Sequence, residues 1–198
     1  MKNFMKFGLV MAMLFAMAFS TFANTTDFSM RAMGTVGKTV SFSLFEAKDI
    51  KISLYTANDE LLFSEKVDSN GNINRKYDLN AFPNGTYTLE AESAAKITSY
   101  DIIVLNNEAK ISEAKAEVKK PMLVNKNGRV SLSIINQHNT PIEIVLLDEN
   151  GTELYSETTG AKVSLVKMFN FNSISAGDFT FVTRYGKRQF TDTITVGN

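Results

Sequence analysis

Asn84-Gly-Thr-Tyr-Thr-Leu89 recurs 92 residues later as Ala176-Gly-Asp-Phe-Thr-Phe181. The same spacing relates Lys51-Ile-Ser-Leu-Tyr55 to Glu143-Ile-Val-Leu-Leu147. Further upstream the spacing falls to 90, and an insertion of two residues near 139–141 accounts for the change. Because self-similarity at one fixed spacing is the signature of repeated units, the sequence predicts two copies of one domain.

Each copy has the alternation of β-strands. Val40, Phe42 and Leu44 alternate with Ser41 and Ser43, which places the apolar side chains on one face of an extended strand. The same pattern recurs through both copies and predicts seven strands in each. In the first copy we expect them near 27–33, 39–46, 50–56, 60–67, 72–79, 85–93 and 97–105.

Turn residues separate these runs. Four Asn-Gly pairs start at Asn70, Asn84, Asn127 and Asn150, and both residue types tolerate the positive φ of tight hairpins. Closely spaced strands joined by such turns favour sandwiches over βαβ units. We therefore predict an all-β fold of two tandem immunoglobulin-like antiparallel β-sandwiches.

Two stretches resemble a bacterial family pattern. They are Ile52-Ser-Leu-Tyr-Thr-Ala-Asn-Asp-Glu-Leu-Leu-Phe63 and Asp78-Leu-Asn-Ala-Phe-Pro-Asn-Gly-Thr-Tyr-Thr-Leu89. They resemble small secreted β-sandwich modules of unknown function and the C-terminal sorting domains of type IX secretion cargo. The second copy carries a closer counterpart of the first stretch and a looser one of the second. The resemblance implies an immunoglobulin-like fold and export.

The N-terminus is typical of a secretory signal peptide. Lys2 and Lys6 precede an uncharged run from Gly8 to Phe19, which is shorter than the roughly 20 apolar residues of a membrane-spanning helix. Small residues at Thr21 and Ala23 predict cleavage after Ala23. We therefore expect a signal peptide at 1–23, a first sandwich at 24–106, a second at 107–198, and no membrane span in the mature chain.

The sequence of residues 107–120 gives conflicting signals for secondary structure. Their Ala, Glu and Lys residues favour a helix by propensity, whereas Ala114, Ala116 and Val118 alternate with charged residues as in a strand. We expect a linker that becomes the first strand of the second copy.

Composition excludes several kinds of chemistry. The chain has 21 basic and 21 acidic residues, one His and no Cys, so neither a nucleic-acid surface, a thiol nucleophile nor a His-based metal site is expected. No Gly-x-Ser-x-Gly elbow is present. We expect no catalytic residues, no metal and no cofactor, and hence no enzyme.

One local cluster stands out as a candidate ligand site. Arg184, Tyr185, Lys187 and Arg188 form the expected tip of a hairpin in the second copy. Three cations around one Tyr can hold a carboxylate, sulfate or phosphate, although a solvated turn is the simpler alternative.

These observations predict an exported, non-enzymatic protein with a binding or adhesion role in the periplasm or at the cell surface. An envelope protein or an anionic glycan is the expected partner, and nucleic acid is not. The alternative is a secretion-linked protein whose C-terminal domain acts as a sorting signal.

Overall fold

The computed structural model describes residues 28–46, 48–68, 71–174 and 176–197. In these ranges the chain forms antiparallel strands and no helix, which confirms the expected all-β fold of β-sandwiches. Accordingly, no helix in the described ranges has the length and hydrophobicity needed to cross a membrane. The predicted signal peptide and its cleavage site lie outside these ranges.

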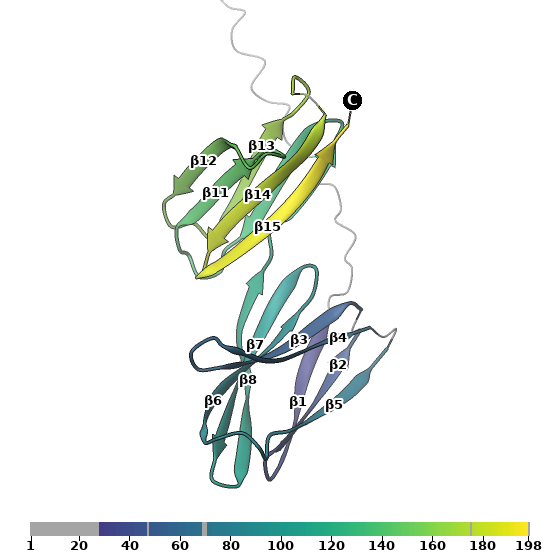
Figure 1. The fold of residues 1–198 in the computed structure, drawn as a ribbon, viewed down its shortest axis with the longest axis vertical. Helices are drawn as coiled ribbons and strands as arrows, with labels where there is room; N and C mark the ends of the chain where they lie inside the picture. The colour runs from purple at the N-terminus through teal and green to yellow at the C-terminus, as the bar shows by residue number, and fades with distance from the viewer. Residues whose placement is uncertain (1–27, 47, 69–70, 175, 198) are drawn as a thin grey trace, which may run out of the picture.

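The first unit contains β1 to β8 and forms the lower half of the molecule in Figure 1. A sheet of order β1-β2-β5 faces one of order β4-β3-β6-β7-β8. The strands are β1 (Ser29–Val36), β2 (Thr39–Phe45), β3 (Ile50–Thr56), β4 (Leu61–Val67), β5 (Ile73–Asp78), β6 (Gly85–Glu92), β7 (Lys96–Leu105) and β8 (Glu108–Lys119).

The second unit contains β9 to β15 and forms the upper half. Its sheets have the orders β13-β10-β9 and β12-β11-β14-β15. The strands are β9 (Met122–Lys126), β10 (Arg129–Ile135), β11 (Ile142–Leu147), β12 (Glu153–Thr159), β13 (Ser164–Asn170), β14 (Gly177–Tyr185) and β15 (Arg188–Val196).

Strands at the predicted spacing occupy equivalent places in the two units. The order β1-β2-β5 corresponds to β9-β10-β13, and β4-β3-β6-β7 corresponds to β12-β11-β14-β15. Each unit also has its own cluster of buried apolar side chains. The division of the chain into 24–106 and 107–198 stays a prediction.

Alternation explains which side chains fill the cores. In β2, Val40, Phe42 and Leu44 are fully buried, as are Val130 and Leu132 in β10. Since side chains of a strand point alternately to its two faces, these residues fix which face of each sheet turns inward. The cores are therefore built from the residues that the sequence pattern singled out.

Residues 107–120 contain the expected strand, but the expectation that it is the first strand of the second copy is wrong. Residues 108–119 are not a linker into the second unit but form β8, which pairs with β7 from Leu105↔Glu108 to Lys96↔Lys119. Ala109 is 1% exposed and packs in the first core. Tertiary pairing with β7 outweighs the helix propensity of Ala, Glu and Lys.

Candidate functional site

The four predicted ligand-binding residues lie at one end of the second unit, in the β14–β15 hairpin. Arg184 and Tyr185 end β14, and Arg188 begins β15. The two residues of the turn, Gly186 and Lys187, both have positive φ, at 55° and 65°. This is the geometry that matches the twist of two-residue hairpins, so the predicted tip is present as a structural element.

Arg184 makes its side-chain contacts within its own sheet. Its Nη1 donates to Glu143 Oε1 at 2.8 Å, and its Nε donates to Gln189 Oε1 at 2.8 Å. Glu143 lies opposite Arg184 on the neighbouring strand β11. The guanidinium charge is thereby neutralised by a side chain that is 41 residues away in the sequence.

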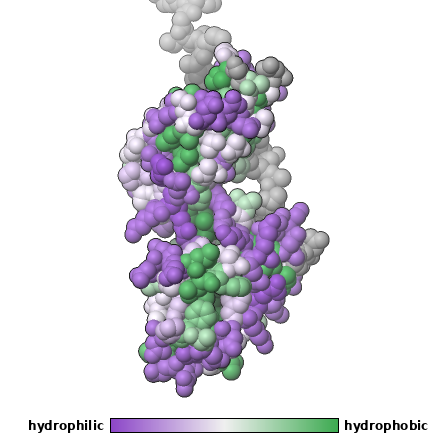
Figure 2. Space-filling model, viewed as in Figure 1, coloured by the Kyte–Doolittle hydropathy of each residue, from purple (hydrophilic) through white to green (hydrophobic). Residues whose placement is uncertain are grey.

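Tyr185 and Arg188 face the first unit. The Tyr185 hydroxyl donates to the Lys119 carbonyl oxygen at 2.5 Å, and burial, with a smaller contribution from Asp192, raises the pKa of this phenol above its ordinary value. Both terminal nitrogens of Arg188 contact the carboxylate of Glu90 on β6. These two residues therefore join the units, and hydrophilic side chains lie on both sides of the junction in the view of Figure 2.

Apolar packing reinforces this junction. Ile97 of β7 and Val118 of β8 pack in the core of the second unit, although their strands belong to a sheet of the first unit. Tyr185 and Phe190 stack with ring centroids 5.1 Å apart in the same cluster. Aromatic side chains of the β14–β15 hairpin and apolar side chains of the first unit therefore belong to one buried cluster.

Lys187 is the remaining cation of the predicted site. It is exposed, and the described residues offer it no ion-pair or hydrogen-bond partner. The hairpin borders a cavity of about 510 Å³ that also contacts Thr140, Pro141 and Thr158. The structure brings the four predicted residues together, but ion pairs occupy two of the three cations. Anion binding at this tip stays a prediction.

Within the described ranges, no metal centre accompanies the hairpin. Among the described residues there is no group of three or more His, Asp or Glu side chains that could hold a metal ion. His138 lies next to the turn, and a side chain added at Gly186 would meet its Cδ2 at 3.3 Å. What this end of the unit presents is a junction and a shallow cavity.

A second candidate surface escaped the sequence analysis. The outer face of the sheet β9-β10-β13 exposes Met122, Val166 and Met168 by 45%, 68% and 67%. Strand register places Met122 and Val166 on either side of Ser133, and Val124 and Met168 on either side of Ser131. Short serines between longer apolar side chains make a shallow apolar strip along β10. We call this surface the apolar face.

The matching positions in the first unit hold polar side chains. There, Arg31 and Asn74 flank Ser43, and Lys76 lies opposite Ser41. Asn74 and Lys76 precede Val166 and Met168 by the repeat spacing of 92 residues. The fold therefore accepts polar side chains at these positions, and the apolar ones of the second unit are not required for packing.

The charges on the apolar face have one sign. Its three strands carry Lys126, Arg129 and Lys167 and no acidic residue. Lys167 turns to the edge, where it pairs with Glu157. Lys126 and Arg129 lie opposite each other at one end of the strip, which gives the face an apolar centre and a basic end.

The comparisons with known proteins point to export. Residues 36–105, from the end of β1 to the end of β7, match the family described as the secretion system C-terminal sorting domain. The match lies in the first unit and covers less than half of the chain. It indicates export toward the cell surface or the extracellular space. The comparison with curated proteins finds no match.

Solved structures give only distant likenesses. The BSP domain of a biofilm associated protein shares 17% identity at a TM-score of 0.28, covering 84% of this chain and 29% of that one. The human OSCAR ligand-binding domain shares 12% at 0.26, covering 85% and 97%. Native alpha-2-macroglobulin from Escherichia coli, spanning domains NIE-MG1, shares 12% at 0.27, covering 85% and 98%. None of these superpositions is close enough to bear on function.

Proposed function

We propose that this chain is an exported, non-enzymatic binding protein and that the apolar face of its second unit is the binding surface. The single observation that carries the proposal is the contrast between the two units. Equivalent positions hold Arg31, Asn74 and Lys76 in one unit and Met122, Val166 and Met168 in the other. Exposed apolar side chains that the fold does not need are typical of interaction sites.

The free energy available from burying these apolar side chains suits a protein partner. Covering the exposed parts of Met122, Val166 and Met168 releases about 3–4 kcal/mol before the costs of association. Apolar side chains gain nothing from the hydroxyl groups of a glycan, whereas a protein surface offers apolar groups that fill the strip. Arg129, exposed at the basic end of the strip, favours a partner with carboxylates next to those groups. The partner class that fits is therefore an envelope protein with an apolar, acid-flanked surface.

The test exchanges the face of one unit for that of the other. Residues 24–198 carrying Met122→Arg, Val166→Asn and Met168→Lys receive the side chains that the first unit already accommodates. We expect retention on intact cells of the producing organism to fall at least about tenfold, the equivalent of about 1.4 kcal/mol, with unchanged urea unfolding.

The matched control makes the reverse exchange. Asn74→Val with Lys76→Met places the same apolar residues on the first unit, and we expect its retention to equal that of the wild type. Equal retention of the wild type and the triple variant would show that binding does not use the apolar face. Loss of retention after treatment of the cells with a glycosidase, but not with a protease, would reassign the partner to a glycan.

The family match favours a second candidate function. Residues 36–105 resemble a sorting domain, so the chain can also be read by an export machine, with the signal in the first unit. The alternative stated from the sequence placed that signal in 107–198. Exchanging Asp78-Leu-Asn-Ala-Phe-Pro-Asn84 for the corresponding 170–176 segment tests this. A sorting role predicts accumulation in the periplasm, whereas normal release into the medium removes it.

A further inference from the structure

Strand β7 carries a partner that its counterpart β15 lacks. In the first unit, β8 pairs with the outer edge of β7 along nearly its whole length. In the second unit, β15 is the last strand of the sheet and pairs only with β14 among the described residues. Equivalent edges of one fold thus differ in whether a strand covers them.

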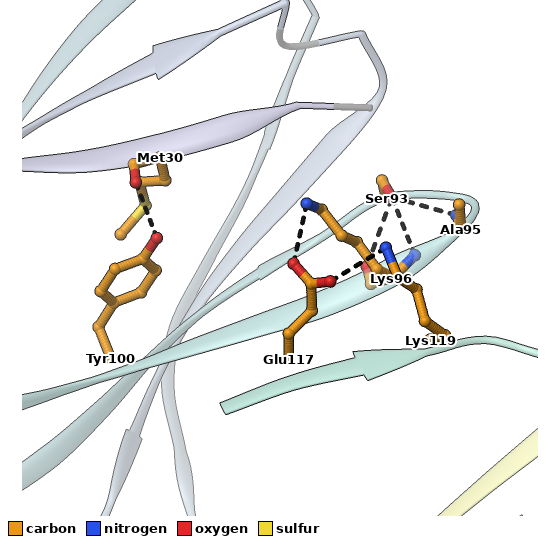
Figure 3. Close-up of polar contacts among 7 residues, drawn as sticks. All are labelled: Met30, Ser93, Ala95, Lys96, Tyr100, Glu117 and Lys119. Atoms are coloured by element: carbon orange, nitrogen blue, oxygen red, sulfur yellow. Dashed lines mark hydrogen bonds and ion pairs between the residues drawn. The ribbon is translucent and has the colours of Figure 1, made fainter. Parts of the chain in front are cut away.

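Figure 3 shows how β8 closes the first unit. The Tyr100 hydroxyl of β7 reaches across to β1 and donates to the Met30 carbonyl oxygen at 2.9 Å. Glu117 of β8 lies between Lys96 and Lys119, at 3.0 Å from the Nζ of each. The seam between β7 and β1 is therefore filled by β8 and fixed by polar contacts.

In the second unit the residue equivalent to Tyr100 is Asp192. It alternates with Phe190 and Ile194 along β15, on the side of the strand that faces the core, but the residue itself is exposed at the open edge of the sheet. No hydrogen bond or ion pair to its carboxylate occurs within the described ranges. Lys120 acts on it electrostatically, but the Lys120 ammonium is bound to Glu92 at 2.6 Å. The seam next to β15 thus holds a carboxylate without a direct partner.

We infer that the outer edge of β15 accepts an extended strand from another polypeptide, with a Lys or Arg facing Asp192. The pairing of β7 with β8 shows that this edge of the fold accepts a strand, and backbone hydrogen bonds supply the affinity of such an addition. Asp192 determines which strands can bind, because an inward charge on an edge strand disfavours any partner strand that leaves the charge unpaired. This strand edge is distinct from the outer face of β9-β10-β13, and the inference does not depend on the proposed function.

Two versions of the β8 peptide are the probes. The parent segment 108–119 holds three Lys and three Glu among small apolar residues. Ala114 of this segment lies opposite Tyr100, the counterpart of Asp192. A cationic version has its glutamates replaced by glutamine and carries Ala114→Lys, and an anionic version has its lysines replaced by glutamine and carries Ala114→Glu. The remaining apolar residues are the same in both, so the two versions differ only in charge.

Amide hydrogen exchange of residues 24–198 locates the peptide. We expect the cationic peptide, at about 1 mM, to slow exchange in residues 188–196 and to leave residues 96–105, which β8 already covers, unchanged. Asp192→Asn is expected to weaken binding about two- to fivefold, the range of a partly exposed ion pair. The control is Glu153→Gln on β12, which removes an exposed carboxylate at the opposite edge of the same sheet.

Three results overturn the inference. They are absence of slowed exchange in residues 188–196, equal binding of the anionic peptide, and slowed exchange confined to residues 96–105 through exchange with β8. Unchanged affinity in Asp192→Asn would also contradict the selective role of that carboxylate. Circular dichroism of each variant shows that the fold is intact.

Discussion

Replacing Arg188 by Met removes the ion pair that joins the two units. Glu90 is 7% exposed, and its other described partner is the Ser99 hydroxyl, which donates to Oε1 at 3.2 Å. The variant therefore leaves a buried carboxylate with one neutral donor. Removing one member of a fully buried pair costs about 3–5 kcal/mol, but the Arg188 side chain is 36% exposed, so water replaces part of the lost contact. We expect a loss of about 2 kcal/mol, from these bounds.

A double-mutant cycle isolates this contribution. Urea unfolding compares the wild type, Arg188→Met, Glu90→Gln and the double variant. Because the double variant buries no charge, we expect it to be more stable than Arg188→Met, with a coupling energy of about 1–2 kcal/mol. Trypsin cleavage after Lys119 gives a second readout, since a loosened junction exposes that segment and Pro121 blocks cleavage after Lys120. Equal unfolding and cleavage of the wild type and Arg188→Met would refute the view that this pair holds the junction.

Three further predictions concern the same end of the second unit. Tyr185→Phe removes the hydrogen bond to Lys119 and should cost about 1 kcal/mol in urea unfolding; no change would contradict this contact. Burial raises the Asp192 pKa, so the stability present below the unfolded pKa is lost as pH rises through the folded pKa. Asp192→Asn should therefore be more stable than the wild type at pH 7 and equal to it near pH 3, about a unit below the unfolded value, and a constant difference across that range would contradict this. Lys187→Glu should unfold like the wild type but bind heparin, the probe for an anion site, less tightly. Equal heparin binding would show that the hairpin tip is not an anion-binding site.

Most strands were predictable because local pattern determines them. The expected range 50–56 coincides with β3, and 85–93 with β6 to within one residue. Alternation of apolar residues sets the inward face of such strands. Among the described Asn-Gly pairs, Asn127-Gly128 between β9 and β10 has positive φ at both residues, at 50° and 71°. Tyr87 and Phe179, the matching aromatic residues of the two repeated segments, are both buried, at 7% and 4% exposed.

β8 was not predictable in the same way. Its Ala, Glu and Lys residues give conflicting local signals, and its structure is decided by pairing with β7. The contacts of Arg188 were likewise out of reach, because Glu90 lies 98 residues away in the sequence. Local pattern identified the hairpin tip but could not show that its charges are used within the chain.

The apolar face was predictable from the sequence only in part. Comparison at the repeat spacing places Val166 where the first copy has Asn74, and Met168 where it has Lys76. That contrast was readable in the sequence. Only the strand register, however, shows that Met122 of β9 lies in the same row as Val166. Sequence differences between copies of one fold are thus a guide to function once pairing is known.

Oxidative footprinting of methionine tests the central claim most directly. Met122 and Met168 lie on the apolar face, and Met33, 62% exposed in the first unit, is a matched internal reference. If the apolar face is the binding surface, attachment of residues 24–198 to cells protects Met122 and Met168 from oxidation and leaves Met33 as reactive as in free protein. Equal oxidation of all three in the attached protein would contradict the account.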